Sequence, residues 1–90
     1  MVSHVLEDAY ILARSTVDIL LERAETVIGY FNDRPINRTL HDDDQLVNAV
    51  RSYNTAINAI LTDHIPLHSE LIEHPRLMAI RKFLRSNGGY

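Results

Sequence analysis

Apolar residues in the first third of the chain recur at alternating intervals of four and three positions. This spacing places side chains on one face of an α-helix, in the heptad pattern that packs helices against each other. We therefore expect a helical stretch over residues 3–31, capped by Ser3. Ser15-Thr16 followed by Asp18 is the only internal cap-like sequence, and a break there would give two shorter helices. The stripe consists of Leu6, Tyr10, Ala13, Val17, Leu20, Ala24, Val27 and Phe31.

A second helical stretch follows the polar segment 33–41 and extends to about Leu61. It begins with Asp42, Asp43 and Asp44, and carboxylates in a first helical turn are stabilised by the free backbone N–H groups there. Its apolar residues also repeat with helical spacing. The expected buried positions are Leu46, Val50, Tyr53, Ile57 and Ile60.

The third stretch begins at Pro66 and is interrupted before Pro75, which has no N–H and would clash with the carbonyl of Leu71. We expect a short helix over 66–73 and a main segment over 75–86, with Gly88 ending it in the left-handed conformation. No stretch alternates with a period of two. The sequence thus predicts one all-α domain over residues 1–90, an antiparallel bundle of four helices, or of three if residues 3–31 form one long helix. The inner positions of the last segment are Leu77, Ile80 and Leu84.

Composition excludes several classes of protein. The 90 residues contain no cysteine, which excludes disulfide scaffolds and thiolate metal sites, and only three glycines, too few for a phosphate-binding glycine loop. Arg14, Asp18 and Glu22 interrupt the first apolar stretch, so no run has the roughly 18 apolar residues of a membrane span. The start Met-Val-Ser-His lacks the features of a signal peptide, and we expect a cytoplasmic location.

Charge is distributed unevenly along the chain. The net charge of −3 divides into −4 over residues 1–33, −3 over residues 34–74 and +4 over residues 75–90. An acidic body with one basic end argues against a nucleic-acid groove. Such an end suits an anionic membrane surface or an acidic patch on a partner. The alternative is that the cations only complement the C-terminal end of the last helix dipole.

Two clusters have the residue types of a metal site. Pro66 separates His64 from His68, which disrupts the helical spacing of four that zinc-binding histidines use. The run His41-Asp42-Asp43-Asp44 has no nearby glycine of the kind that calcium loops need. We expect capping and surface roles for both, with no metal, no cofactor and no catalytic residue set. The first cluster comprises His64, His68, His74, Glu70 and Glu73.

The region Asn54 to Tyr90 resembles the immunity proteins for pediocin-like bacteriocins. An Ile-rich, Asn-containing segment leads through the polar turn 62–64 to Ile65-Pro66-Leu67, then to a last helix over 77–84 and a closing Gly89-Tyr90. Leu46-Val47-Asn48 with Tyr53 is similar to the start of that family's third helix. Its second helix is similar to Leu20-Leu21, Ala24, Ile28 and Pro35.

This resemblance implies a non-catalytic, cytoplasmic four-helix bundle. It also implies protection of the mannose phosphotransferase permease, the membrane receptor that the bacteriocin converts into a pore. The C-terminal half would recognise the bacteriocin–receptor complex from inside the cell. Carried onto this chain, the recognition residues are Ile65, Leu67, His68, Met78, Arg81, Lys82, Phe83, Arg85 and Tyr90.

Two other classes remain open. Leu20-Leu21-Glu22-Arg23, in the first of three stretches of decreasing length, resembles the all-α chorismate mutases, intertwined dimers with a long first helix. Arg23 would match an arginine of that family, but the first stretch lacks its early Arg and has no Lys. The other class is a helical adaptor or antitoxin-like module. The heptad stripe of residues 6–31 offers a homodimer contact in either case.

Overall fold

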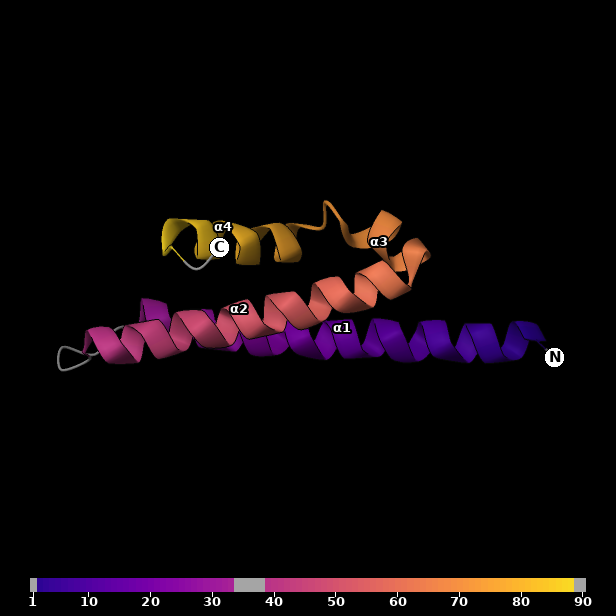
Figure 1. Cartoon of the computed structure of the whole chain (residues 1–90), viewed down its shortest axis with the longest axis horizontal. Helices are drawn as coiled ribbons and strands as arrows, with labels where there is room; N and C mark the ends of the chain where they lie inside the picture. The colour runs from indigo at the N-terminus through magenta and orange to yellow at the C-terminus, as the bar shows by residue number, and fades with distance from the viewer. Residues whose placement is uncertain (1, 34–38, 89–90) are drawn as a thin grey trace.

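Four helices make up the described part of the chain. In the computed structural model, the backbone is described for residues 2–33 and 39–88, and the side chains in the same ranges from residue 7 onward. Figure 1 shows α1 and α2 running antiparallel along each other, with α3 and α4 folded back over one side of this pair. No strand occurs among the described residues, and the expected all-α bundle is confirmed. The helices are α1 (Val2–Asn32), α2 (Leu40–Asp63), α3 (Ile65–Leu71) and α4 (Pro75–Ser86).

Helix α1 is continuous through Ser15 and Thr16. The Thr16 hydroxyl donates a 2.9 Å hydrogen bond to the carbonyl oxygen of Leu12 in the preceding turn, so it does not cap a new helix. The expectation that a fourth helix requires a break within residues 3–31 is therefore wrong. The fourth helix arises instead because the last helical stretch is interrupted at residues 72–74, between α3 and α4. Pro75 starts α4, since its missing N–H needs no partner in the first turn of a helix.

The start of α2 is determined by a reciprocal cap. The Thr39 side chain accepts a hydrogen bond from the backbone N–H of Asp42 at 3.2 Å, and Asp42 Oδ2 accepts one from the backbone N–H of Thr39 at 3.1 Å. This capping box satisfies two backbone donors that a helix start otherwise leaves free. The helix therefore begins at Leu40, two residues before the predicted acidic turn.

The heptad stripe of α1 forms its core side. Ala13, Val17 and Ala24 are buried as the spacing predicts, but at the middle position Leu21 is buried and Leu20 is only half-buried. An α-helix repeats every 3.6 residues, so a strict 3.5-residue stripe drifts around the helix surface. From Tyr10 to Phe31 the residues of the stripe belong to the protomer core or pack against it.

In α2 the buried face is rotated by one residue from the predicted one. The prediction placed Leu46, Tyr53 and Ile60 inside, and all three are half-buried. Val50 and Ile57 are buried as expected. Helix α2 contacts α1 on one side and both α3 and α4 on the other. The buried face of α2 is therefore turned toward α3 and α4. The residues buried by this shift are Val47, Asn54 and Leu61.

The molecule is elongated because α1 and α2 are much longer than the helices that cover them. Its extents are 56 × 18 × 17 Å, and its radius of gyration is 15.2 Å, against about 12 Å for a compact domain of this length. Helices α3 and α4 cover only one side of the α1–α2 pair (Figure 1). Within the described ranges, no helix combines the length and apolarity needed to cross a bilayer.

Candidate partner-recognition surface

Helix α4 presents the basic end of the chain on a defined helical face. His74 caps the helix, since its Nδ1 atom accepts a hydrogen bond from the backbone N–H of Arg76 at 3.2 Å. At the other end Gly88 adopts a φ of 69°, the left-handed conformation expected for a residue that ends a helix. The buried side of α4 consists of Leu77, Ile80 and Leu84.

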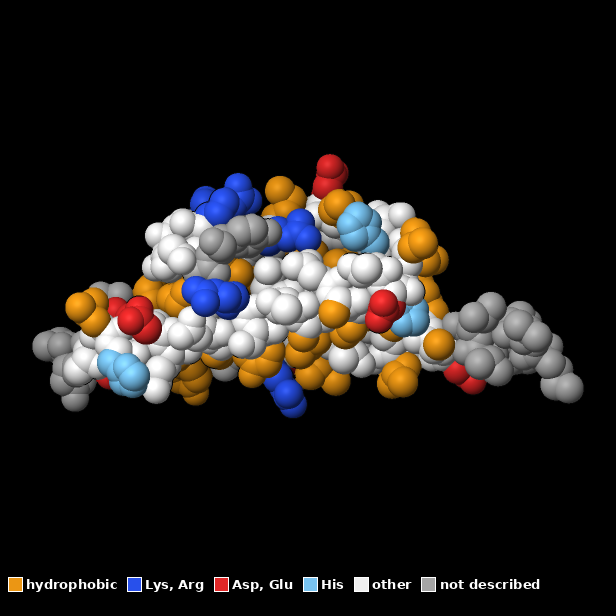
Figure 2. Space-filling view, in the orientation of Figure 1, with side chains coloured by type: hydrophobic (Ala, Val, Ile, Leu, Met, Phe, Trp, Pro, Cys, Tyr) orange, Lys and Arg blue, Asp and Glu red, His pale blue; other side chains and the backbone are white. Residues whose placement is uncertain are grey.

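The opposite side of α4, which we call the α4 outer face, combines apolar and cationic groups. Met78 is 52% exposed, and Lys82 and Arg85 are exposed beside it. Figure 2 shows blue side chains gathered over α4 on this side of the molecule. The face contains no acidic residue, so its potential is positive. A shallow depression runs along it, lined by Pro75, Met78, Ala79, Lys82, Arg85 and Ser86.

Arg81 belongs to the attachment of α4 rather than to the α4 outer face. Its guanidinium donates hydrogen bonds to the backbone carbonyl of Ile72, at 3.3 Å, and to Asn58 Oδ1 on α2, at 3.4 Å. The side chain is half-buried by these contacts. Arg81 follows the buried Leu77 by four positions, and this spacing is a sequence signal that it lies close to the inner side of the helix.

Phe83 also attaches α4 to the body of the protein. Its ring meets that of Phe31 at the end of α1, edge to face, with centroids 5.0 Å apart and planes at 89°. Edge-to-face aromatic pairs add about 0.5–1.5 kcal/mol beyond the burial of their surface. Phe83 therefore positions the α4 outer face instead of offering its ring to a partner.

The predicted residues of α3 divide between surface and core. Ile65 is 73% exposed and His68 is exposed, whereas Leu67 is fully buried and packs in the hydrophobic core. Leu67 thus anchors α3, and Ile65 and His68 of the same helix lie at the surface. Tyr90 lies outside the described residues.

Charged contacts fasten both short helices to α1. Arg76 of α4 donates to Glu25 through Nε at 3.1 and 3.2 Å and through a terminal nitrogen as well. This hydrogen bonding lowers the pKa of the Glu25 carboxyl and raises the pKa of Arg76. The two residues lie 51 positions apart, so no local pattern in the sequence signals the pair.

Glu70 performs the same role for α3. Its carboxylate accepts a 2.6 Å hydrogen bond from the hydroxyl of Tyr10 and a second one from Arg14, which also lies 3.6 Å from Asp18. Bonding to the Glu70 carboxylate raises the pKa of the Tyr10 hydroxyl. These contacts attach α3 and α4 to α1.

His64 has a structural position at the junction of two helices. It joins α2 to α3, since its backbone N–H donates to Ile60 at 3.0 Å and its carbonyl accepts from Leu67 at 2.9 Å. Within residues 7–33 and 39–88, no three His, Asp or Glu side chains are placed to share a metal ion. The exposed groups on α4 are aliphatic and cationic.

Three comparisons with known proteins add no relative. No protein-family model matches the sequence, and no curated protein or solved structure is detectably similar to the chain.

Proposed function

We propose that this chain is an immunity protein against a pediocin-like bacteriocin. In this proposal it acts without catalysis in the cytoplasm, where it binds the bacteriocin-occupied mannose phosphotransferase permease and blocks the pore. The α4 outer face is the observation that carries the proposal. It joins Met78, Lys82 and Arg85 on one helix that is fastened to α1 and α2.

The physical argument rests on what such a face can bind. The cytoplasmic side of a membrane is negatively charged, and each nearby Lys or Arg gains about 1 kcal/mol from it. Met78 adds a flexible apolar contact next to Lys82 and Arg85. Because α4 is attached at both ends, through Arg76 and Phe83, little ordering is needed when a partner binds.

The resemblance to the immunity proteins implies that recognition residues also lie on α3. Ile65 and His68 are exposed there. Figure 2 shows histidine and hydrophobic side chains over α3, on the same side of the molecule as the cations over α4. We therefore assign recognition to Ile65, His68, Met78, Lys82 and Arg85, and positioning to Leu67, Arg81 and Phe83.

Expression in a bacteriocin-sensitive lactic-acid bacterium tests this function. We expect resistance to at least one peptide of a pediocin-like panel, and loss of that resistance in the Lys82→Glu/Arg85→Glu variant. Lys82→Arg/Arg85→Lys is the matched control, since it retains both charges and should still protect. Circular dichroism should show that all three proteins are equally folded, because both positions are exposed. If the unmodified chain protects against no peptide of the panel, the proposal fails.

The unbroken α1 favours a second candidate, a dimer related to the chorismate mutases. Arg23 lies in a groove with Ile19, Glu22, Thr26, Val27 and Tyr53, and it is the one cation among these lining residues. A dianionic transition state needs several cations, so this groove is a weak candidate for that reaction. Prephenate formation from chorismate by the purified protein would support this second candidate against the first.

A further inference from the structure

A second uncovered surface runs along α1. Leu12 is 69% exposed and Ile19 is 49% exposed, on a different side of α1 from the residues that contact α3 and α4. The other side carries Arg14 and Glu25, which contact those two helices. Figure 2 shows hydrophobic side chains along the lower edge of the molecule, where α1 lies in Figure 1.

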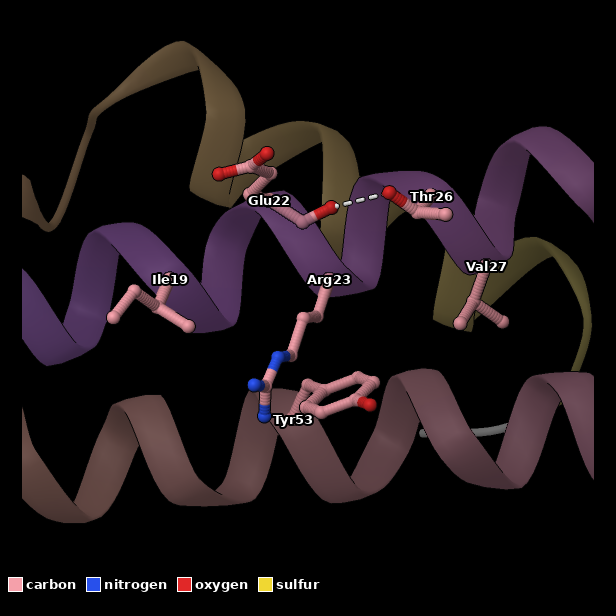
Figure 3. Close-up of a pocket in the computed structure, with 6 residues that line it drawn as sticks. All are labelled: Ile19, Glu22, Arg23, Thr26, Val27 and Tyr53. Atoms are coloured by element: carbon pink, nitrogen blue, oxygen red, sulfur yellow. Dashed lines mark hydrogen bonds between the residues drawn. The ribbon is translucent and has the colours of Figure 1, made fainter.

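Helix α2 widens this surface. One shallow groove includes Leu12 and Thr16 from α1 with Ile60 from α2. The next groove includes Ile19 and Arg23 from α1 with Tyr53 from α2. Figure 3 shows Arg23 extending from α1 toward α2 beside the Tyr53 ring, with Ile19 and Val27 to either side. An incoming helix would therefore meet both long helices.

The charges at the two ends of the exposed α1 stripe are opposite. Asp8 precedes Leu12 by four residues, and Arg23 follows Ile19 by four residues. Both are exposed, and neither has an ion-pair partner in the described part of the protomer. Small polar residues occupy the middle. We call this stripe the α1 docking face: Asp8, Leu12, Ser15, Thr16, Ile19 and Arg23.

The α1 docking face is self-complementary. Its order is acid, aliphatic, small, aliphatic, base, and the reverse order is base, aliphatic, small, aliphatic, acid. Two copies in antiparallel orientation, centred between Ser15 and Thr16, therefore place each Arg23 opposite the Asp8 of the other copy. In the same arrangement Leu12 lies opposite Ile19. A two-fold axis generates both pairings twice, as in most homodimers.

We propose that the partner of this face is a second copy of the chain, bound antiparallel along α1. The stripe spans about 22 Å along the helix, and Tyr53 and Ile60 of each copy flank it. The interface differs from the heptad stripe, whose residues from Tyr10 to Phe31 pack in or against the protomer core. It is independent of the proposed immunity function, because the α4 outer face lies on another side of the molecule.

Sedimentation equilibrium of the full chain and its charge variants tests the pairing. We expect a dimer for the unmodified chain, and at least about tenfold weaker association for Arg23→Asp, which places like charges opposite each other. The Asp8→Arg/Arg23→Asp variant exchanges the two charges and should restore association to within about threefold of the unmodified chain. A monomer at every concentration up to the sub-millimolar range overturns the proposal. Equal weakening in the single and double variants also overturns it.

Cysteine cross-linking tests the register independently. The chain has no cysteine, so Ser15→Cys introduces one thiol close to the two-fold axis. We expect rapid oxidation to a covalent dimer for Ser15→Cys and slow oxidation for Glu73→Cys, an exposed control away from α1. Equal rates for the two variants would contradict an interface at the α1 docking face. This readout requires no bacteriocin, so its failure leaves the immunity test unaffected.

Discussion

The α4 outer face and the α1 docking face are both uncovered, but their charge patterns differ. The first carries Lys82 and Arg85 and no acidic residue, so two copies of it repel each other. The second has an acid and a base at equal distances from its centre, so it attracts a copy of itself. The distribution of charge, rather than apolar exposure alone, therefore distinguishes a face that suits a second copy from a face that suits a foreign anionic partner.

The position of the α4 outer face depends most on the buried side chains that hold α4 in place. Leu84→Ala removes a fully buried side chain from the core, and we expect it to lower the free energy of unfolding by about 2–5 kcal/mol. Met78→Ala on the α4 outer face is the matched control and should change it by about 0.5 kcal/mol or less. Urea denaturation followed by circular dichroism measures both. Similar losses for the two variants would show that α4 does not pack as described.

The aromatic contact sharpens the claim that Phe83 positions the α4 outer face. A double-mutant cycle of Phe31→Leu and Phe83→Leu should give a coupling free energy of about 0.5–1.5 kcal/mol. The reason is that the edge of one ring packs on the face of the other. A coupling near zero would mean that the two rings stabilise the protein separately.

The Glu25–Arg76 pair provides a pH-dependent attachment. Its side chains are 42% and 39% exposed, so we expect a coupling of less than about 1 kcal/mol in a cycle of Glu25→Gln and Arg76→Gln. The pKa of folded Glu25 is lowered, so its stabilisation is present above the pKa of the unfolded carboxyl. It is lost as the pH falls through the lower pKa of the folded state. Urea midpoints from neutral to acidic pH should therefore fall less in Glu25→Gln than in the unmodified protein.

The smallest expected effect concerns Tyr10 at the attachment of α3. The pKa of its hydroxyl is raised by the hydrogen bond to Glu70, so the stabilisation is present below the pKa of an unfolded tyrosine. It is lost as the pH rises through the higher pKa of the folded state. Tyr10→Phe should remove this alkaline dependence. Thermal unfolding at neutral and strongly alkaline pH measures it, and an unchanged dependence in the variant would contradict the contact.

The sequence predicted the fold best where one side of a helix packs against a single neighbouring helix. The repeat through Ala13, Val17 and Ala24 predicted the core side of α1, and the acidic residues from Asp42 predicted the start of α2 to within two positions. The prediction was less accurate in the middle of α2, where Asn54 is buried and Tyr53 is half-buried. A helix that packs between two neighbours buries the residues that face both of them. Which residues these are depends on where the second neighbour packs.

The candidate surface was only partly predictable. The excess of cations after Pro75 identified the region, and the helical repeat separated Lys82 from the buried Leu77. The prediction grouped Arg81 with Lys82, although its spacing of four from Leu77 signals a position near the inner side of α4, and its partner Asn58 on another helix could not be predicted. The uncovered side of α1 was also missed, since periodicity identifies the most apolar stripe but not how many sides of a helix its neighbours cover.

By itself the sequence determined the helices, their approximate ends and the uneven charge, because helix periodicity, capping and proline geometry act over a few residues. Only the tertiary structure decided which cations are free. Arg76 and Arg81 are engaged by Glu25 and Asn58, whereas Lys82 and Arg85 remain on the α4 outer face. The physical reason is that such pairings join residues 23 to 51 positions apart and depend on how whole helices pack.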